Sequence, residues 1–594
     1  MGVLVQNRAV QSSAANRRDL SRFFSVRMLR AIARLIDSYP WTVYLLVTMG
    51  CCWIRVGAFA TRFLDHDELY SFYIAQASSL KQLFYLTQTV DLHPPLSYLL
   101  IRLSFTVFGP TTWACRLPFL LAFLCTTAAL FVFVRRLLSP LYGVITVLFL
   151  WCVPYTHFAA EARPYSLVLC FTSVMLLSWY RCISHGESST GGRRAALPAL
   201  AAAEFGLLLS HVLGVFSVAA FAGAELVRFL IRRKQDRMLW IALLIPCASV
   251  LTYFPLIHSG STILFTEKYR ATPARLFHLY WAYLTWLPIP LACVILLAAL
   301  WPKAGKSKPG TVPSITPTAL RSLSFLLFAF AMVPLGVGAI FARTGVAFFD
   351  RYGIVFLISM AATPALLLGL RTQCNRVPAS LVALVLGAVL VFNTVGKAWF
   401  IEQVSIAPPK VAEMLIHLMS LPVVGMPKTP PAPIHPILTA PNAGPVRDLD
   451  AVEPDIPIVA NTGLTFLELD READDTLATR LYLLNDISAA TEITHDTVFE
   501  NYARLKQVFP IRGRVDPFCP FIAQHHEFLV VGDYNHAQGW LLKKLDRDGA
   551  ELRILGTYDD HTTEDGHIYE VTVKSSTCPP QAVQAGPQVS ALMR

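Results

Sequence analysis

The residues at 65–68, Asp-His-Asp-Glu, follow directly after an apolar stretch long enough to cross a bilayer. The same segment ends with Asp91, His93 and a Pro-Pro pair. Desolvation and mutual repulsion both disfavour charged carboxylates beside a membrane. Such a cluster is therefore tolerated mainly where it binds a cation, takes up a proton or faces a water-filled cavity. We expect residues 61–112 to form a catalytic loop outside the membrane.

The three carboxylates Asp65, Asp67 and Glu68 have two readings. At the start of a helix, acidic side chains are stabilised by the helix dipole and commonly act only as caps. Crowding beside a membrane instead favours a functional group, so all three are candidate catalytic residues. A divalent cation, if one is used, would be bound by Asp65 and Asp67. Whether a cation is needed stays open.

Two further motifs place polar groups on the side predicted for Asp67. His93 precedes Pro94, which favours an extended entry into the next helix, and the histidine could be a proton or phosphate partner or simply part of a rigid turn. The segment at 161–165, Glu-Ala-Arg-Pro-Tyr, carries Glu161 and Arg163 just outside an apolar stretch. An arginine there forms a structural ion pair or holds a phosphate, which suits its planar donor group.

The composition excludes an ordinary soluble protein, because the 594-residue chain is 54% hydrophobic and only 15% charged. A net charge of +11 would suit nucleic acid. The arginines and lysines, however, cluster in short loops between apolar stretches, as the positive-inside rule requires, so no nucleic-acid partner is expected. The predicted fold is an α-helical polytopic membrane protein of about 11 transmembrane helices with a C-terminal soluble α/β domain.

Counting spans of roughly 20 residues places the main basic clusters on one side of the membrane and the acidic or histidine-bearing loops on the other. The basic region 1–40 is expected in the cytoplasm and 41–400 in the transmembrane domain. The stretches 71–86 and 96–108 are expected to lie in the outer interface. The predicted spans are 41–60, 113–134, 141–158, 165–180, 197–209, 213–230, 238–257, 279–301, 323–341, 352–370 and 379–395.

The C-terminal third differs in composition from the membrane domain. Residues 401–445 are Pro-rich and predict a linker, 446–577 predict an external α/β domain, and 578–594 predict a disordered tail. Cys519 and Cys578 fall in this polar region and would be able to pair if it is exported. The expected strands and helices are 456–460, 528–531, 553–555 and 568–573, and 497–508 and 538–545, respectively.

Several motifs in order resemble one family. They are the Asp-Glu pair soon after the first span, His-Pro-Pro-Leu-Ser-Tyr at 93–98, Trp-Ala-Cys-Arg-Leu-Pro at 113–118, Glu-Ala-Arg-Pro-Tyr at 161–165 and Asp-Arg-Tyr at 350–352. Together they are similar to the GT-C membrane glycosyltransferases, in the dolichyl-phosphate-mannose–protein mannosyltransferase-like group that includes bacterial lipid A aminoarabinose transferases. The resemblance covers 41–180 well and the remaining membrane part more loosely.

The resemblance implies transfer of a sugar from a polyprenyl-phosphate donor to a protein, lipid or glycan acceptor on the non-cytoplasmic face. It implies that Asp67 is the base or acceptor-orienting carboxylate, with Glu68 beside it, although Asp65 also fits the acidic position. Glycosyl transfer builds negative charge on the leaving phosphate, so cations must steady it. The candidate substrate-binding residues are His93, Glu161, Arg163, Tyr165, Arg351, Lys268 and Arg270.

Two other functions remain as alternatives. A lipid-linked glycan transporter or flippase would need ionisable residues within facing spans, whereas here they collect mostly at one external face. A third reading makes the C-terminal domain the working part and the membrane region its anchor. About 11 spans are more than an anchor needs, since one or two signals suffice for stable attachment. The C-terminal domain is expected to be periplasmic, extracellular or luminal.

Overall fold

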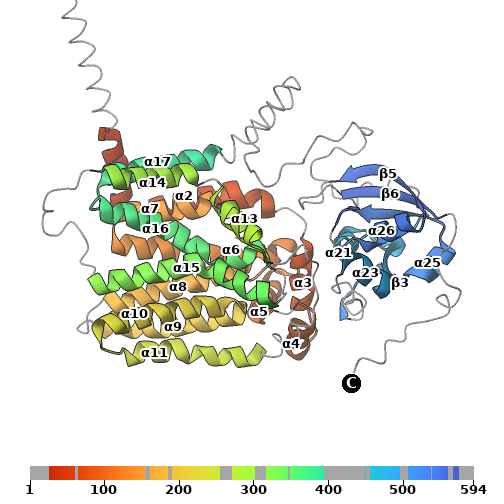
Figure 1. Cartoon of the computed structure of the whole chain (residues 1–594), viewed down its shortest axis with the longest axis horizontal. Coiled ribbons are helices and arrows are strands. Elements are labelled where there is room, and N and C mark those ends of the chain that lie inside the picture. The colour runs from red at the N-terminus through yellow and green to blue at the C-terminus, as the bar shows by residue number, and fades with distance from the viewer. Residues whose placement is uncertain are drawn as a thin grey trace, which may run out of the picture.

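The computed structural model has a helical domain and a C-terminal α/β unit, with helices α3, α4 and α5 lying between their main bodies (Figure 1). The structure describes residues 26–60, 64–91, 93–153, 161–184, 190–253, 271–285, 287–301, 316–344, 348–392, 449, 455–495, 506, 508–536, 538–558 and 566–573.

Apolar helices make this chain an integral membrane protein. Within the described residues, four helices are long and apolar enough to cross a membrane, or up to five if one bent pair is a single span. The four are α6 (Thr112–Leu137), α8 (Tyr165–Ser184), α10 (Gly214–Arg232) and α15 (Pro317–Thr344). The expected count of about 11 is thus confirmed only in part.

Helices at the other predicted spans are mostly shorter. They are α2 (Pro40–Ala60), α7 (Pro140–Cys152), α9 (Thr190–Ser210), α11 (Arg237–Leu244) with the 3-10 helix η2 (Pro246–Tyr253), α13 (Pro273–Leu284), α14 (Pro288–Leu300), α16 (Phe356–Arg371) and α17 (Arg376–Val391). The expected span 279–301 is broken, because α13 and α14 meet at 77°. α7 ends before its predicted limit, since Val153 precedes a proline and is extended.

Several helices end in basic residues at one end of the domain. Arg135 and Arg136 lie in the last turn of α6, Arg181 in that of α8, Arg232 in that of α10 and Arg371 in that of α16. Cations there complement the negative end of the helix dipole. The residues that precede α8, at 161–164, consequently lie at the opposite end.

The predicted external loop folds into three short helices: α3 (His66–Ala75), α4 (Leu80–Thr89) and α5 (Leu96–Phe108). The expected stretch 71–86 is interrupted, because Gln76 ends α3 and the Ser79 side chain caps α4. α3 begins with a capping box. The Asp65 carboxylate accepts from the Asp67 N–H, while the Glu68 carboxylate accepts from the Asp65 N–H. The cap sets the direction of the helix that carries Asp67.

The C-terminal unit is a six-stranded sheet in the order β3-β2-β1-β4-β6-β5. The first four strands of that order run parallel and the last two pair antiparallel. Helices alternate with the parallel strands, which makes this unit an α/β fold. The elements are β1 (Ile458–Ala460), α21 (Gly463–Glu472), α22 (Asp475–Arg480), β2 (Leu481–Asn485), α23 (Ile487–Thr494), β3 (Arg514–Pro517), α25 (Phe518–Gln524), β4 (Glu527–Gly532), α26 (Trp540–Arg547), β5 (Glu551–Tyr558) and β6 (Gly566–Thr572).

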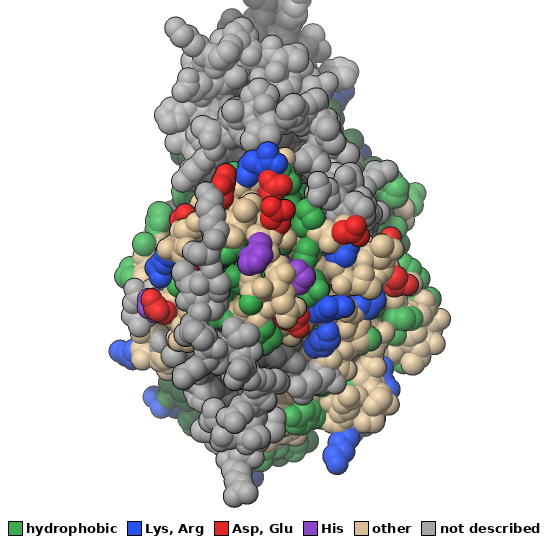
Figure 2. Space-filling view, turned by 90° about the vertical axis from the view of Figure 1, so that its right-hand side faces the viewer, with side chains coloured by type: hydrophobic (Ala, Val, Ile, Leu, Met, Phe, Trp, Pro, Cys, Tyr) green, Lys and Arg blue, Asp and Glu red, His purple; other side chains and the backbone are tan. Residues whose placement is uncertain are grey.

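The four expected strands coincide with β1, β4, β5 and β6, and the expected helix 538–545 with α26. The pattern missed β2, β3, α21, α22, α23 and α25. The predicted helix 497–508 lies largely outside the described residues. Cys519 is disulfide-bonded. Its expected partner, Cys578, lies outside the described residues. Figure 2 shows the side of this unit that faces away from the helical domain, where acidic, basic and histidine side chains are interspersed.

The two parts share one hydrophobic cluster, in which Leu69 and Phe72 of α3 join Phe466 and Leu467 of α21. Tyr73 stacks on Phe509 with ring centroids 5.1 Å apart. The Arg471 guanidinium lies 4.1 Å from the centre of the Phe72 ring. The helix that carries the acidic motif is therefore packed from the side of the C-terminal unit.

Candidate active site

Glu68 ties α3 to two other elements. Its carboxylate accepts two bonds from Arg116 of α6, from Nε at 2.8 Å and from Nη2 at 2.5 Å. The Ala162 N–H also donates to it, at 2.8 Å. Glu68 is fully buried, and Arg116 is nearly so. A carboxylate held this tightly is suited to fix the site rather than to exchange protons with a substrate.

Asp67 lies one residue earlier and points toward cations. Its Oδ2 is 2.5 Å from Arg351 Nη1 and 4.0 Å from Arg163 Nε. Arg351 comes from the short 3-10 helix η4 (Asp350–Gly353), more than 280 residues along the chain. Its guanidinium lies over the rings of Phe349 and Tyr165, 4.8 Å and 5.7 Å from their centres. The stacking fixes the plane of the group that holds Asp67.

Arg163 links the acidic helix to the end of the loop. Its Nη1 donates to Asp91 Oδ2 at 2.6 Å and to the Asp67 carbonyl at 3.1 Å. Tyr98 donates its hydroxyl to the same Asp91 oxygen, at 2.5 Å. Burial alone would raise the pKa of Asp91, but the charges of Arg163 and His93 lower it to about 2. Asp91 is thus an anion at neutral pH that orients Arg163.

Glu161 is a second buried carboxyl group at this site. Burial raises its pKa to about 8, the charge of Asp65 adds to the rise, and Arg351 opposes it. At neutral pH the side chain is mostly protonated. It can therefore donate a hydrogen bond, which an ionised carboxylate cannot do.

Two histidines, His93 and His211, lie in contact at one side of the site. The His93 ring contacts the His211 ring with centroids 5.2 Å apart, and His211 also lies 5.7 Å from Tyr165 and 6.0 Å from Tyr352. His211 Nδ1 accepts from the Leu213 N–H, so a neutral ring carries its proton on Nε2. Burial lowers the pKa of His211 well below 6.5, and the charges of His93 and Arg163 lower it further, so the ring is neutral.

Exposure divides the site into two layers. The side chains of Asp67, His93 and Arg351 are 16%, 15% and 23% exposed. Arg163 is only 3% and Glu68 0% exposed. The open layer therefore places a carboxylate, an imidazole and a guanidinium within reach of a ligand. The buried layer holds them in position.

The structure brings together Asp65, Asp67, Glu68, His93, Glu161, Arg163, Tyr165 and Arg351, all of which the sequence analysis selected. Asp65 serves as the N-cap of α3. Lys268 and Arg270 lie outside the described residues. Their selection for substrate binding stays a prediction.

Asp65 and Asp67 do not form a pocket for a divalent cation. The first carboxylate faces the backbone of its own helix, and the second is held by Arg351. In the part of the chain that the structure describes, no three His, Cys, Asp or Glu side chains are grouped as metal ligands. The described residues of this site therefore do not fit a bound metal.

Three residues of the site were not selected as candidates from the sequence: Asp91, Arg116 and His211. Asp91 belongs to the same acidic loop but received no role, and Arg116 was noted only within a motif. His211 lies between the predicted spans 197–209 and 213–230 and was not selected. A polar residue two positions before His93 was a usable signal for Asp91. His211, in contrast, is distant in sequence and joins the site through the packing of α9 against α8 and the contact of its ring with Tyr165.

Comparison with known proteins gives one sequence match and a set of structural likenesses. Residues 92–258 match the family described as Dolichyl-phosphate-mannose-protein mannosyltransferase, which confirms the resemblance drawn from the motifs. That range includes His93, Glu161 and Arg163 but neither Asp67 nor Arg351. No curated protein matches the chain as a relative.

Two similar solved structures are of ArnT from Cupriavidus metallidurans. The form bound to undecaprenyl phosphate is 13% identical, with a TM-score of 0.45 over 91% of this chain and 99% of that one. The apo form is 16% identical, with a TM-score of 0.40 over 92% of this chain and 99% of that one.

Proposed function

Proceeding from the family match over residues 92–258, we propose that this chain is a membrane glycosyltransferase. It moves a sugar from a polyprenyl-phosphate donor to a hydroxyl-bearing protein, lipid or glycan acceptor. One observation carries the proposal: Asp67 and Arg351 share a 2.5 Å ion pair in the open layer of the site. A base and a phosphate ligand in direct contact are what transfer from a phosphate leaving group requires.

The proposed reaction is a single displacement. The acceptor oxygen attacks the anomeric carbon while the bond from that carbon to the phosphate oxygen breaks. The acceptor proton goes to Asp67, and the electron pair of the broken bond stays on the leaving polyprenyl phosphate. Arg351, released from Asp67 as the carboxylate takes up the proton, steadies the phosphate together with His93.

The remaining residues are proposed to position this pair. Arg163 and Glu68 hold the backbone and the helix of Asp67 through the contacts described above. Glu161, mostly protonated at neutral pH, binds substrate as a hydrogen-bond donor. A neutral carboxyl adds no further negative charge beside the donor phosphate, which an ionised one would repel. Tyr165 and Phe349 support the Arg351 guanidinium from its faces.

The site is proposed to face the non-cytoplasmic side. Basic residues gather at the helix ends opposite it, and such residues favour the cytoplasm. The disulfide at Cys519 suits an oxidising compartment for the C-terminal unit. No observation favours the alternative function of a transporter or flippase.

The test is transfer of a labelled sugar by the full chain reconstituted in vesicles. Asp67→Asn should lower turnover by about 10²–10⁴-fold, because the acceptor proton loses its base. Asp65→Asn is the matched control, since asparagine caps a helix as well as aspartate does and the cap should be kept. Full activity of Asp67→Asn, at equal protein level, would remove that residue from the mechanism. Movement of the donor lipid without a covalent product would instead support a flippase.

A further inference from the structure

A basic pocket lies at the far end of the helical domain from the active site. α8 connects the two places, because Tyr165 at its start contacts His211 and Ser184 at its end lines the pocket. Its 20 residues span about 30 Å at roughly 1.5 Å each. The pocket is therefore separate from the proposed transfer chemistry.

The pocket is a cavity of about 790 Å³ between α8, α9, α10, α11 and α15. This volume falls within the roughly 300–1,000 Å³ of small-ligand sites. Its lining carries a single carboxylate, that of Asp236. The lining cations are Arg193, Arg194, Arg228, Arg232, Lys234 and Arg237.

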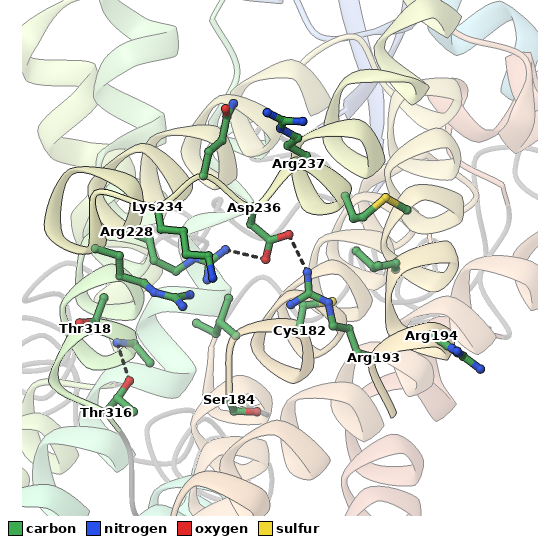
Figure 3. A pocket seen from close by; sticks show the side chains of 16 residues that line it. Cys182, Ser184, Arg193, Arg194, Arg228, Lys234, Asp236, Arg237, Thr316 and Thr318 are labelled. Carbon is green, nitrogen blue, oxygen red and sulfur yellow. Dashed lines mark hydrogen bonds and ion pairs between the residues drawn. The ribbon is translucent and has the colours of Figure 1, made fainter. Parts of the chain in front are cut away.

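The buried part of the lining is already ion-paired. Arg228, whose side chain is only 5% exposed, bonds Glu225 and Asp236 at 2.8 Å and 3.0 Å. Arg193 Nη2 lies 2.6 Å from the other oxygen of Asp236. Figure 3 shows the Asp236 carboxylate between these two guanidinium groups. Asp236 also caps α11, so its charge is fully engaged.

The outer part of the lining carries positive charges that no described carboxylate of the pocket neutralises. Arg194, Arg232 and Arg237 are exposed, and no described carboxylate pairs with them. Three helices, α9, α11 and α15, also begin at this pocket, and it is lined by residues of their first turns. The start of a helix carries partial positive charge and unpaired N–H groups. Cations and the starts of helices together favour the binding of an anion that accepts several hydrogen bonds, such as a phosphate.

The surroundings point to a phosphate carried by a lipid. The pocket is also lined by Ile183, Leu197 and Met238, and it lies where α8 and α10 end at the edge of the membrane-spanning region. The adjacent Leu230 and Ile241 are 49% and 47% exposed. An apolar surface beside a basic pocket suits an acyl chain beside a charged headgroup.

We propose that this pocket binds the headgroup phosphate of an anionic phospholipid. Arg194, Arg232 and Arg237 contact the phosphate, and the acyl chains lie along the exposed apolar side chains of α10 and α11. The bound lipid bridges α9, α10 and α11 at the end of the domain away from the active site.

The experiment measures lipid retention by the purified full chain with native mass spectrometry. Phosphatidylglycerol, phosphatidylcholine and inorganic pyrophosphate are titrated separately and in competition. Phosphatidylglycerol should be retained in preference to phosphatidylcholine, and pyrophosphate should not displace it. The triple variant Arg194→Gln, Arg232→Gln, Arg237→Gln should weaken retention about a hundredfold, since each basic residue beside anionic lipid contributes a factor of about five.

The control is a triple variant that removes the same charge from the same end of the domain: Arg233→Gln, Arg321→Gln, Arg371→Gln. None of these residues lines the pocket. Equal weakening by the two triple variants would overturn the proposal, because general electrostatic attraction would explain it. Displacement by pyrophosphate would overturn the lipid assignment in favour of a soluble anion. If the pocket variant fails to fold, Arg232→Gln alone carries the same test.

Discussion

At the scale of single residues, burial assigns different tasks to chemically similar groups. Glu68, Asp91 and Glu161 lie within one site, where the first and third carboxyl groups are buried and the Asp91 side chain is only 9% exposed. Arg116 pairs with the first and Arg163 with the second, and the third has Asp65 as its main charged neighbour. Glu161 consequently keeps its proton at a pH where Asp91 has long lost it. This separation of proton affinities is typical of active sites.

The raised pKa of Glu161 predicts how stability depends on pH. Its folded pKa is about 8 against an ordinary 4.5, so between these values the folded state keeps a proton that the unfolded state has released. This contribution is complete below pH 4.5 and is lost as pH rises through 8. Glu161→Gln, which mimics the neutral acid, should remove a slope of up to about 1.4 kcal/mol per pH unit.

Thermal unfolding of the full chain across this pH range measures the slope. Glu492→Gln is the control, because that side chain is 77% exposed and should leave the slope as it is. An unchanged slope in Glu161→Gln would show that Glu161 is ionised in the folded protein at neutral pH.

At the scale of elements, α3 is the part on which the site depends. Its capping box sets where the helix begins, and the ion pair of Glu68 with Arg116 holds it against α6. The Ala162 N–H connects the same carboxylate to the segment that carries Glu161 and Arg163. We infer that Glu68 is a positioning residue, beside a catalytic Asp67.

Breaking this ion pair should be costly. Glu68→Gln leaves the Arg116 charge buried without its counter-charge and should destabilise the protein by about 3–5 kcal/mol. The double variant Glu68→Leu, Arg116→Met removes both charges and should recover most of that stability. Denaturant unfolding of the reconstituted chain compares the two. A single variant as stable as the wild type would contradict the anchoring role.

At the scale of the whole molecule, the C-terminal unit supports the acidic helix from outside. α21 packs on α3, and Tyr73 and Phe72 of α3 lie against Phe509 and Arg471. The residue after Asp67 is thus held by α6, and the following part of α3 is held by α21 and Phe509 of the C-terminal unit. Docking of the unit and order in α3 should therefore change together.

Shortening one side chain at this interface tests whether docking of the C-terminal unit and order in α3 depend on each other. Phe509→Ala should favour local opening of α3 and α21 by about 3–5 kcal/mol, because a buried aromatic ring is lost. Hydrogen exchange should become faster in both helices and stay unchanged in α26. Ile554→Ala, at a 43% exposed position on β5, is the control. Unchanged exchange in α3 would show that the helix is ordered without the C-terminal unit.

The sequence by itself determined the membrane class, the approximate positions of most apolar helices, four of the six strands and most of the candidate site. These follow from local signals: apolar length, alternation of basic and acidic loops, and polar motifs beside spans. β2 was missed because a short strand buried in a parallel sheet carries no alternation. β3 was missed because it is a four-residue edge strand, Arg-Val-Asp-Pro, with no apolar run.

Only the tertiary structure decided which partner each charge has. The pairs Glu68 with Arg116 and Asp67 with Arg351 join residues far apart in the chain, and no local pattern specifies such contacts. His211 and the basic pocket likewise depend on how separate helices pack. A pKa or a cavity is a property of all the groups that surround it, which is why the roles of these residues emerged from the fold.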